Sequence, residues 1–180
     1  MDAQQLRLSL QKGGPDDQKL GNDFWSSTIR FTEMLTKASS QARSNFLPLV
    51  KSLDTTIVEE LLPSPNHELA AQVQAAMDEQ VAIQSTPGAF PGSKGQVTVQ
   101  IHASKNGVPV NGLYVWLDLA CCVRKNGAAY ALPNVTSPAK GAVMPGTYQV
   151  RLRQSDKTVA ERRVLIGAAS GVDKVDVILP

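Results

Sequence analysis

Cysteine, histidine and aromatic residues are scarce in this chain of 180 residues. The two cysteines, Cys121 and Cys122, are adjacent, which excludes both a secreted framework of several disulfides and a four-thiolate zinc site. The two histidines have no carboxylates at metal-ligand spacing, so we expect neither a metal site nor a cofactor. Aromatic residues make up 5% of the chain, too few for the stacking platform that single-stranded nucleic acid requires. The net charge of +2 is also too small to indicate a nucleic-acid partner.

Long apolar runs are absent too. The longest, residues 113–123, is about half of the roughly 20 residues that a membrane-spanning helix needs, and Asp118 interrupts it. Residues 1–21 lack the basic start and the continuous apolar stretch of a secretion signal. We therefore expect a soluble protein without membrane insertion, located in the cytoplasm, or extracytoplasmic if Met1 replaces a signal.

Composition divides the chain into two halves. Residues 85–95 contain two Pro, three Gly and two Ser, which indicates a linker. Residues 1–84 carry 7 basic and 11 acidic residues, a net charge of −4, and residues 85–180 carry 11 and 5, a net charge of +6. Three explanations of this charge difference are open: the halves dock on each other, each half has a partner of opposite charge, or the difference is the ordinary scatter of net charge among small domains. We predict a flexible segment (1–21), a helical module (22–84), the linker (85–95) and a β-sandwich (96–180).

The first helix of the module is predicted from an apolar stripe. Asn22 or Asp23 can cap its start, because their side-chain oxygens accept from free amides of the first turn. Spacings of four and three then place these residues on one face: Phe24, Thr28, Phe31, Leu35, Ala38, Ala42 and, one turn on, Phe46. Flanking apolar residues widen the stripe, which favours a small bundle over a two-stranded coiled coil. Pro48 should interrupt or kink this helix near Phe46.

Two further helices complete the module. Apolar residues 57, 58, 61 and 62 indicate a short helix, with Asp54 or Thr55 as its cap and Pro63 as its end. Ser64 and Pro65 then start a helix over residues 65–82. Its apolar face contains Leu69, Val73, Ala76, Met77 and Val81. This half is expected to be a helical hairpin or small bundle, with a candidate association face made of Phe24, Phe31, Leu35, Leu69 and Val73.

The second half alternates with a period of two, which is typical of half-buried strands. Residues 96–103 and 113–123 indicate two strands, and Asn126-Gly127 indicates a hairpin that returns through residues 128–132. After the Pro- and Gly-rich residues 133–146, three more strands are expected over residues 147–154, 158–166 and 172–179. Six or seven short strands bounded by turn residues fit an antiparallel, Ig-like β-sandwich.

Two segments of this half carry a family pattern: GVPVNGLYVWL at residues 107–117 and MPGTYQVRL at residues 144–152. They resemble the G-x-P-V-x-G-x-x-V-x-L and L-P-P-G-x-Y-x-V pattern of prealbumin-like sandwiches, the carboxypeptidase-regulatory-like and collagen-adhesin B-type repeats. The resemblance implies a sandwich that acts as a spacer, stalk or binding module. The chain departs from the family at residues 130–142, where a glycine-rich segment is usual. The Lys–Asn cross-link of some adhesin repeats is not supported, because residues 96–103 contain no Lys.

The residues that could carry catalysis are few. Cys121 and Cys122 lie in a predicted strand, where neighbouring side chains point to opposite faces, so we expect two reduced thiols, one buried and one exposed. A cysteine nucleophile would need His67 or His102 as its base. His67 is expected in the first turn of a helix and His102 on a strand surface. The sequence has no phosphate-cradling glycine loop, which leaves nucleotide chemistry unsupported.

Arginines mark a candidate binding surface on the sandwich. Arg151 and Arg153 are two apart on one strand and so share a face. Arg162, Arg163 and Arg124 join them if their strands are neighbours, which would form a surface for an acidic partner. Ordinary alternation of polar residues on an exposed strand face explains the same pattern.

These observations favour a non-enzymatic interaction or assembly protein. Its helices would associate with a second copy or with a partner protein, and its sandwich would bind a partner as an adaptor does. The first alternative is an accessory part of a larger multidomain enzyme or surface protein. The second is a cysteine-dependent enzyme.

Overall fold

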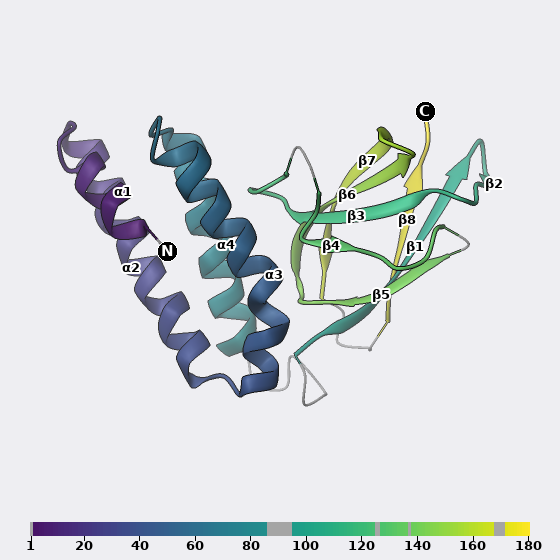
Figure 1. Ribbon diagram of the computed structural model, residues 1–180, viewed down its shortest axis with the longest axis horizontal. Coiled ribbons are helices and arrows are strands. Elements are labelled where there is room, and N and C mark those ends of the chain that lie inside the picture. The colour runs from purple at the N-terminus through teal and green to yellow at the C-terminus, as the bar shows by residue number, and fades with distance from the viewer. Residues whose placement is uncertain (1, 86–94, 125–126, 137, 168–171) are drawn as a thin grey trace. The chain divides into compact units, whose positions relative to one another are not determined.

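The structure is a computed structural model that describes residues 2–85, 95–124, 127–136, 138–167 and 172–180. The chain divides into two compact units, Met1–Pro87 and Gly88–Pro180, which we call the helical unit and the β unit. All described helices belong to the first and all described strands to the second, as the colours of Figure 1 show. This confirms an α+β protein with segregated parts. The predicted linker, residues 85–95, lies outside the described residues except for Ser85 and Gly95.

The helical unit begins earlier than predicted. Its described elements are α1 (Ala3–Leu10), α2 (Pro15–Lys37), α3 (Ser40–Thr56), the π-helical turn η1 (Ile57–Leu61) and α4 (His67–Ser85). The prediction of a flexible segment over residues 1–21 is wrong, because α1 and the start of α2 lie there. Leu6 and Leu10 of α1 are buried. Gly21 lets α1 approach α2, since a Cβ at this position would lie 3.2 Å from the Cβ of Leu10.

The helix starts differ from the predicted caps. α2 begins at Pro15, and Asp17 accepts a hydrogen bond from the Gly14 amide at 3.1 Å. Asn22 and Asp23 therefore lie inside α2 and cap nothing. At α4 the capping residue is Asn66, whose side chain accepts from the Leu69 amide at 2.9 Å. Both starts use a residue that satisfies a free amide of the first turn, which is the physical requirement of a cap.

The predicted break at Pro48 occurs ten residues earlier, at Ala38 and Ser39. Ser39 accepts from the Ala42 amide at 3.2 Å and so starts a new helix, α3, which contains Pro48 in its interior. The expected short helix after Asp54 or Thr55 is not separate, because α3 continues directly into η1. The long stripe thus divides between two helices that face each other. Phe31 and Phe46 meet edge to face with ring centroids 6.4 Å apart.

The β unit has eight strands among the described residues: β1 (Val97–Lys105), β2 (Val108–Pro109), β3 (Tyr114–Leu119), β4 (Tyr130–Ala131), β5 (Ala139–Val143), β6 (Gly146–Gln154), β7 (Lys157–Ile166) and β8 (Val172–Ile178). In one sheet β1 pairs with three strands, namely β2, β5 and β8. The pairing of β1 with β8 is parallel. The other sheet has the order β4-β3-β6-β7. All remaining pairs are antiparallel.

Alternating burial confirms the period-two prediction. Val97, Val99, Ile101 and Ala103 of β1 are buried, and so are Val115, Leu117 and Leu119 of β3. The inner residues of β6 are Tyr148, Val150 and Leu152. The Tyr148 hydroxyl donates to the Met144 carbonyl at 2.6 Å, which ties the end of β5 to β6. These buried faces of the two sheets form the core of the β unit.

Two sequence predictions in this unit are corrected. The second strand ends at Leu119 rather than at residue 123, so Cys121 and Cys122 lie in a turn. β5 was not predicted, because its short sequence lies among Pro and Gly residues and contains Gly141. The expected hairpin after β3 is present as the pairing of β3 with β4, although Asn126 is outside the described residues.

None of the described helices is both long enough and apolar enough to cross a bilayer.

Candidate functional site

The helical unit contains a groove of about 450 Å³ where the ends of three helices meet. α2 ends and α3 begins at this point, and the last turns of α4 close the third side. The apolar part of its lining is Met34, Ala38, Ala42, Phe46 and Val81. The two alanines on either side of the helix break provide little side-chain volume, which leaves this space open beside Phe46.

The rim of the groove is polar and includes two cations. Arg30, Glu33 and Lys37 follow one another along α2, and Gln84 projects from α4. The Nε2 atom of Gln84 is buried, and no described residue accepts a hydrogen bond from it. A buried donor without an acceptor is unfavourable, so the Gln84 amide would gain a hydrogen bond by turning toward a bound carbonyl or carboxylate oxygen in the groove.

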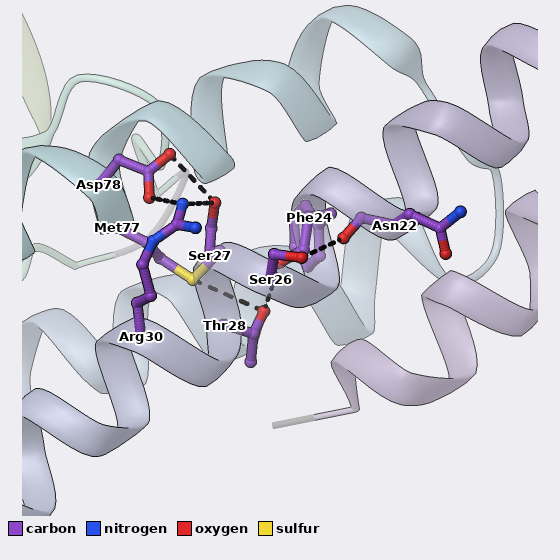
Figure 2. A network of polar contacts seen from close by, with 8 residues as sticks. All are labelled: Asn22, Phe24, Ser26, Ser27, Thr28, Arg30, Met77 and Asp78. Atoms are coloured by element: carbon purple, nitrogen blue, oxygen red, sulfur yellow. Dashed lines mark hydrogen bonds and ion pairs between the residues drawn. The ribbon is translucent and has the colours of Figure 1, made fainter.

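A polar cluster fixes Arg30 at one end of the groove (Figure 2). We call Ser27, Arg30 and Asp78 the α2–α4 clamp. Arg30 donates to the Asp78 carboxylate at 2.8 Å and to the Ser27 hydroxyl at 3.0 Å, and Ser27 donates to Asp78 at 3.0 Å. Ser27 is fully buried, whereas Arg30 is about half exposed. Because the hydroxyl is held by a carboxylate and a guanidinium, the cluster joins two helices and presents Arg30 to solvent.

The predicted association face is divided between core and surface. Phe24, Phe31 and Val73 are fully buried in the helical unit, so they pack against their own chain and are inaccessible to a partner. Leu35 and Leu69 are half-buried. The groove contains other members of the predicted stripes, namely Ala38, Ala42, Phe46 and Val81. The signal that could have located it is Ser39, a good capping residue in the middle of the long stripe.

Arg151 does not form a binding surface. Its guanidinium makes an ion pair with Asp118 and donates to the carbonyls of Arg124 at 3.0 Å and Gly127 at 2.9 Å. The side chain of Arg151 is 7% exposed and that of Asp118 is 0% exposed. The predicted face is therefore covered. The cover consists of residues 120–124 and 127–129, which we call the covering loop, and Ala129 also donates to Asp118 at 2.9 Å.

Arg153 is buried as well, through an aromatic contact. Its guanidinium carbon lies 3.9 Å from the centroid of the Trp116 ring, and that of Arg151 lies 5.3 Å from it. Arg153 also donates to the Asp156 carbonyl at the turn between β6 and β7. Cation–π contact and hydrogen bonds from their terminal guanidinium nitrogens thus hold both arginines against the chain itself. The Nε atom of each is buried, and no described residue accepts a hydrogen bond from it.

The other predicted arginines lie apart. Arg162 donates to the Asp176 carbonyl of β8 and so joins the edges of the two sheets. Arg163 is exposed opposite Gln149, and Arg124 is half-buried in the covering loop. Of the five arginines of the predicted acidic-partner surface, two are exposed, so the continuous basic face expected from the sequence does not form.

Burial controls the ionisation of Asp118. Desolvation raises the pKa of this carboxyl, and the Ala129 amide and the Arg151 guanidinium offset part of that effect. The ion pair is thus a costly arrangement that depends on its hydrogen bonds and on the covering loop.

The cysteines differ from their prediction as two reduced thiols on a strand. Cys121 and Cys122 are bonded to each other in the turn after β3. Neither is a free thiol. The cysteine-nucleophile hypothesis requires a thiol beside a histidine. His67 belongs to the helical unit, where it lies in the first turn of a helix as predicted and pairs with Asp17, although α4 begins at His67 itself and not at Pro65. His102 is half-buried on β1. In the described part of the chain, no three His, Cys, Asp or Glu residues are grouped so that they could hold a metal ion.

Comparison with known proteins gives no relative. No family model, no curated protein and no solved structure matches this chain.

Proposed function

We propose that this chain is a non-enzymatic assembly protein whose helical unit binds a segment of a partner protein in the groove. The observation that carries the proposal is the groove itself, with an apolar lining, a rim on which Arg30 and Lys37 outnumber Glu33, and a buried donor for which no described residue is an acceptor. Its volume of about 450 Å³ lies within the usual range of binding pockets.

The chemistry of the lining selects the partner segment. Met34, Phe46 and Val81 favour an apolar side chain. Lys37 and the exposed part of Arg30, which is paired with Asp78, outnumber Glu33 on the rim and favour a carboxylate near it, and the Gln84 amide favours an oxygen acceptor. The partner is therefore an amphipathic helix with apolar residues on one face and Glu or Asp beside them, bound in the helix-in-groove manner.

For the β unit we propose an Ig-like or prealbumin-like sandwich that acts as a spacer or presenting module. The two four-stranded sheets with alternating burial support it, as do the two sequence segments that resemble those families. The Tyr148 hydroxyl bond to the backbone four residues upstream is similar to the tyrosine corner of Ig-like sandwiches.

Calorimetric titration of the full chain with two synthetic amphipathic peptides tests the proposal. Both peptides have the same leucine face, and their polar faces carry Glu in one and Lys in the other. We expect the Glu peptide to bind and the Lys peptide to bind at least about tenfold more weakly, since the rim cations repel it. Equal binding of both peptides, or of neither, contradicts the proposal.

Two matched variants locate the binding. Ala42→Glu places a carboxylate in the groove, and because Glu then stands three residues after Ser39 it completes a capping box that preserves α3. Ala71→Glu adds the same charge at an exposed position of α4 outside the groove. We expect only Ala42→Glu to abolish peptide binding. Light scattering then compares the solution mass of both variants with that of the unsubstituted chain. If the natural occupant is a second copy of this chain, only Ala42→Glu should lower that mass.

A further inference from the structure

The strand β3 ends at Leu119, before the end of the apolar run that predicted it. Apolar residues continue to Val123, and the Ala120 amide still donates to the Thr147 carbonyl of β6 at 3.0 Å. The chain then turns, since the Cys122 amide donates back to the Leu119 carbonyl at 2.8 Å. The bond between Cys121 and Cys122 lies within this turn.

The bond between the cysteines and an extended strand exclude each other. In a strand, adjacent side chains point to opposite faces, so neighbouring sulfur atoms cannot meet there. β6 continues to Gly146, beyond Tyr148, which pairs with Leu119. An extended β3 would therefore have a partner as far as Pro145, which has no amide to donate. The turn is the observed conformation, and breaking the bond between the cysteines would remove this obstacle to a longer β3.

The turn leads directly into the covering loop. Arg124 and Gly127 accept from Arg151, and Ala129 donates to Asp118, so the loop shields this ion pair only when it begins at the right place. Lengthening β3 would move residues 120–122 into the sheet and shift the start of the loop. A change at the cysteines would thus reach a buried pair formed by Asp118 of β3 and Arg151 of the neighbouring strand β6.

We propose that Cys121 and Cys122 form a reversible exchange site for dithiol reductants, and that their redox state decides whether the covering loop closes over Asp118 and Arg151. This site is independent of the groove in the helical unit. It gives the β unit two states, a closed state with the cysteines bonded and an open state with two thiols.

The exchange reaction follows from the exposure of the two sulfurs. Cys121 is half-buried, whereas Cys122 is 2% exposed. A thiolate of the dithiol attacks the Cys121 sulfur and forms a mixed disulfide, and Cys122 leaves as a thiolate that takes up a proton. The second thiol of the reductant then displaces Cys121, which also becomes a thiol. Two electrons and two protons have passed to the protein, and the reductant has become its cyclic disulfide.

The test compares the full chain after air oxidation with the same protein after treatment with dithiothreitol. Thiols are counted by alkylation and mass spectrometry under denaturing conditions. Loop closure is followed by hydrogen exchange of the Ala129 amide and by Trp116 emission in a Trp25→Phe background. We expect no thiol before treatment and two after it, with Ala129 exchange at least about tenfold faster in the reduced protein, because its hydrogen bond to Asp118 is lost.

Two outcomes overturn the proposal. One is two free thiols after oxidation, which shows that the bond does not form. The other is equal Ala129 exchange and equal Trp116 emission in both states, which shows that the bond does not control the loop. The double variant Cys121→Ala/Cys122→Ala is the matched control: it should exchange as fast as the reduced protein and should not respond to dithiothreitol. If that variant does not fold, the two states of the unmodified cysteines still decide the question.

Discussion

Asp118 shows how one buried side chain can make stability depend on pH. It lies on the outer face of its sheet, yet the covering loop removes it from water. Its neighbour Arg151 compensates for part of the desolvation, and burial remains the largest influence on its pKa. The native β unit therefore holds a proton on Asp118 more tightly than the unfolded chain does.

The first prediction concerns this proton. Because the folded pKa is raised above the ordinary 3.8, the native state binds more protons than the unfolded state between that value and the folded pKa. The contribution of Asp118 to stability therefore increases as the pH falls through this window. Asp118→Asn keeps the acceptor for Ala129 and removes the titration. The difference in the free energy of unfolding, wild type minus variant, should rise on acidification in urea titrations at several pH values. A fall instead would mean that the attraction of Arg151 outweighs burial.

Ser27 is a second buried polar side chain, this time an uncharged hydroxyl in the helical unit. A fully buried hydroxyl needs a partner, and this one has two, the carboxylate of Asp78 and the guanidinium of Arg30. Its neighbour Ser26 is exposed and donates only to the Asn22 carbonyl of its own helix. Two adjacent serines therefore have different tasks, and only the tertiary contact with α4 distinguishes them.

At the scale of elements, Pro48 is the clearest exception to local preference. Proline within a helix has no amide for the carbonyl four residues earlier, here that of Ser44, and its ring crowds that carbonyl. α3 nevertheless continues through Pro48, because Phe46, Leu49 and Leu53 bury its apolar face. Tertiary packing outweighs propensity at this position.

Pro48→Ala should therefore stabilise the helical unit. We expect a gain of about 1–3 kcal/mol, the helix-interior cost of proline less the flexibility that alanine adds to the unfolded chain. The measurement is urea unfolding followed by ellipticity at the helical band. Pro65→Ala, which lies before Asn66 and outside the helices, is the control and should give no gain. An unchanged or lower stability of Pro48→Ala would show that the ring itself makes a necessary contact.

The same competition explains which elements could be predicted from sequence. β1, β6, β7 and β8 agree with their predictions to within two residues at each end, because alternation over many residues is a strong signal. α1, β2 and β5 were missed, since short segments carry little periodicity and are ordered by packing. β3 was predicted too long because strand propensity takes no account of a bond between neighbouring cysteines.

The candidate site was predictable only in part. Ala38, Ala42, Phe46 and Val81 were assigned to apolar stripes, correctly as apolar contacts. That they line a groove depends on the break at Ser39 and on the approach of α4, which are tertiary facts. The arginines show the converse. Alternation correctly placed Arg151 and Arg153 on one face, but it could not show that Trp116 and the covering loop bury them.

At the scale of the whole molecule, each unit has a core of its own. Phe24, Phe31 and Met77 are buried in the helical unit, and Ile101, Leu117 and Tyr148 are buried in the β unit. Salt screens any attraction between the opposite net charges of the two halves, −4 and +6, whereas burial of these side chains is much less sensitive to salt. The free energy of unfolding of each unit should therefore depend on its own core.

A pair of core substitutions tests this independence. Phe31→Ala removes a fully buried ring and should lower the stability of the helical unit by about 3–5 kcal/mol. We expect the helical ellipticity to be lost at a lower urea concentration. The urea transition of Trp116 emission, measured in a Trp25→Phe background, should not change. Ile101→Ala is the reciprocal change in the β unit and should shift only the Trp116 transition. If either substitution moves both transitions, the units unfold together, and the free energy that couples them is the amount by which the unsubstituted unit shifts.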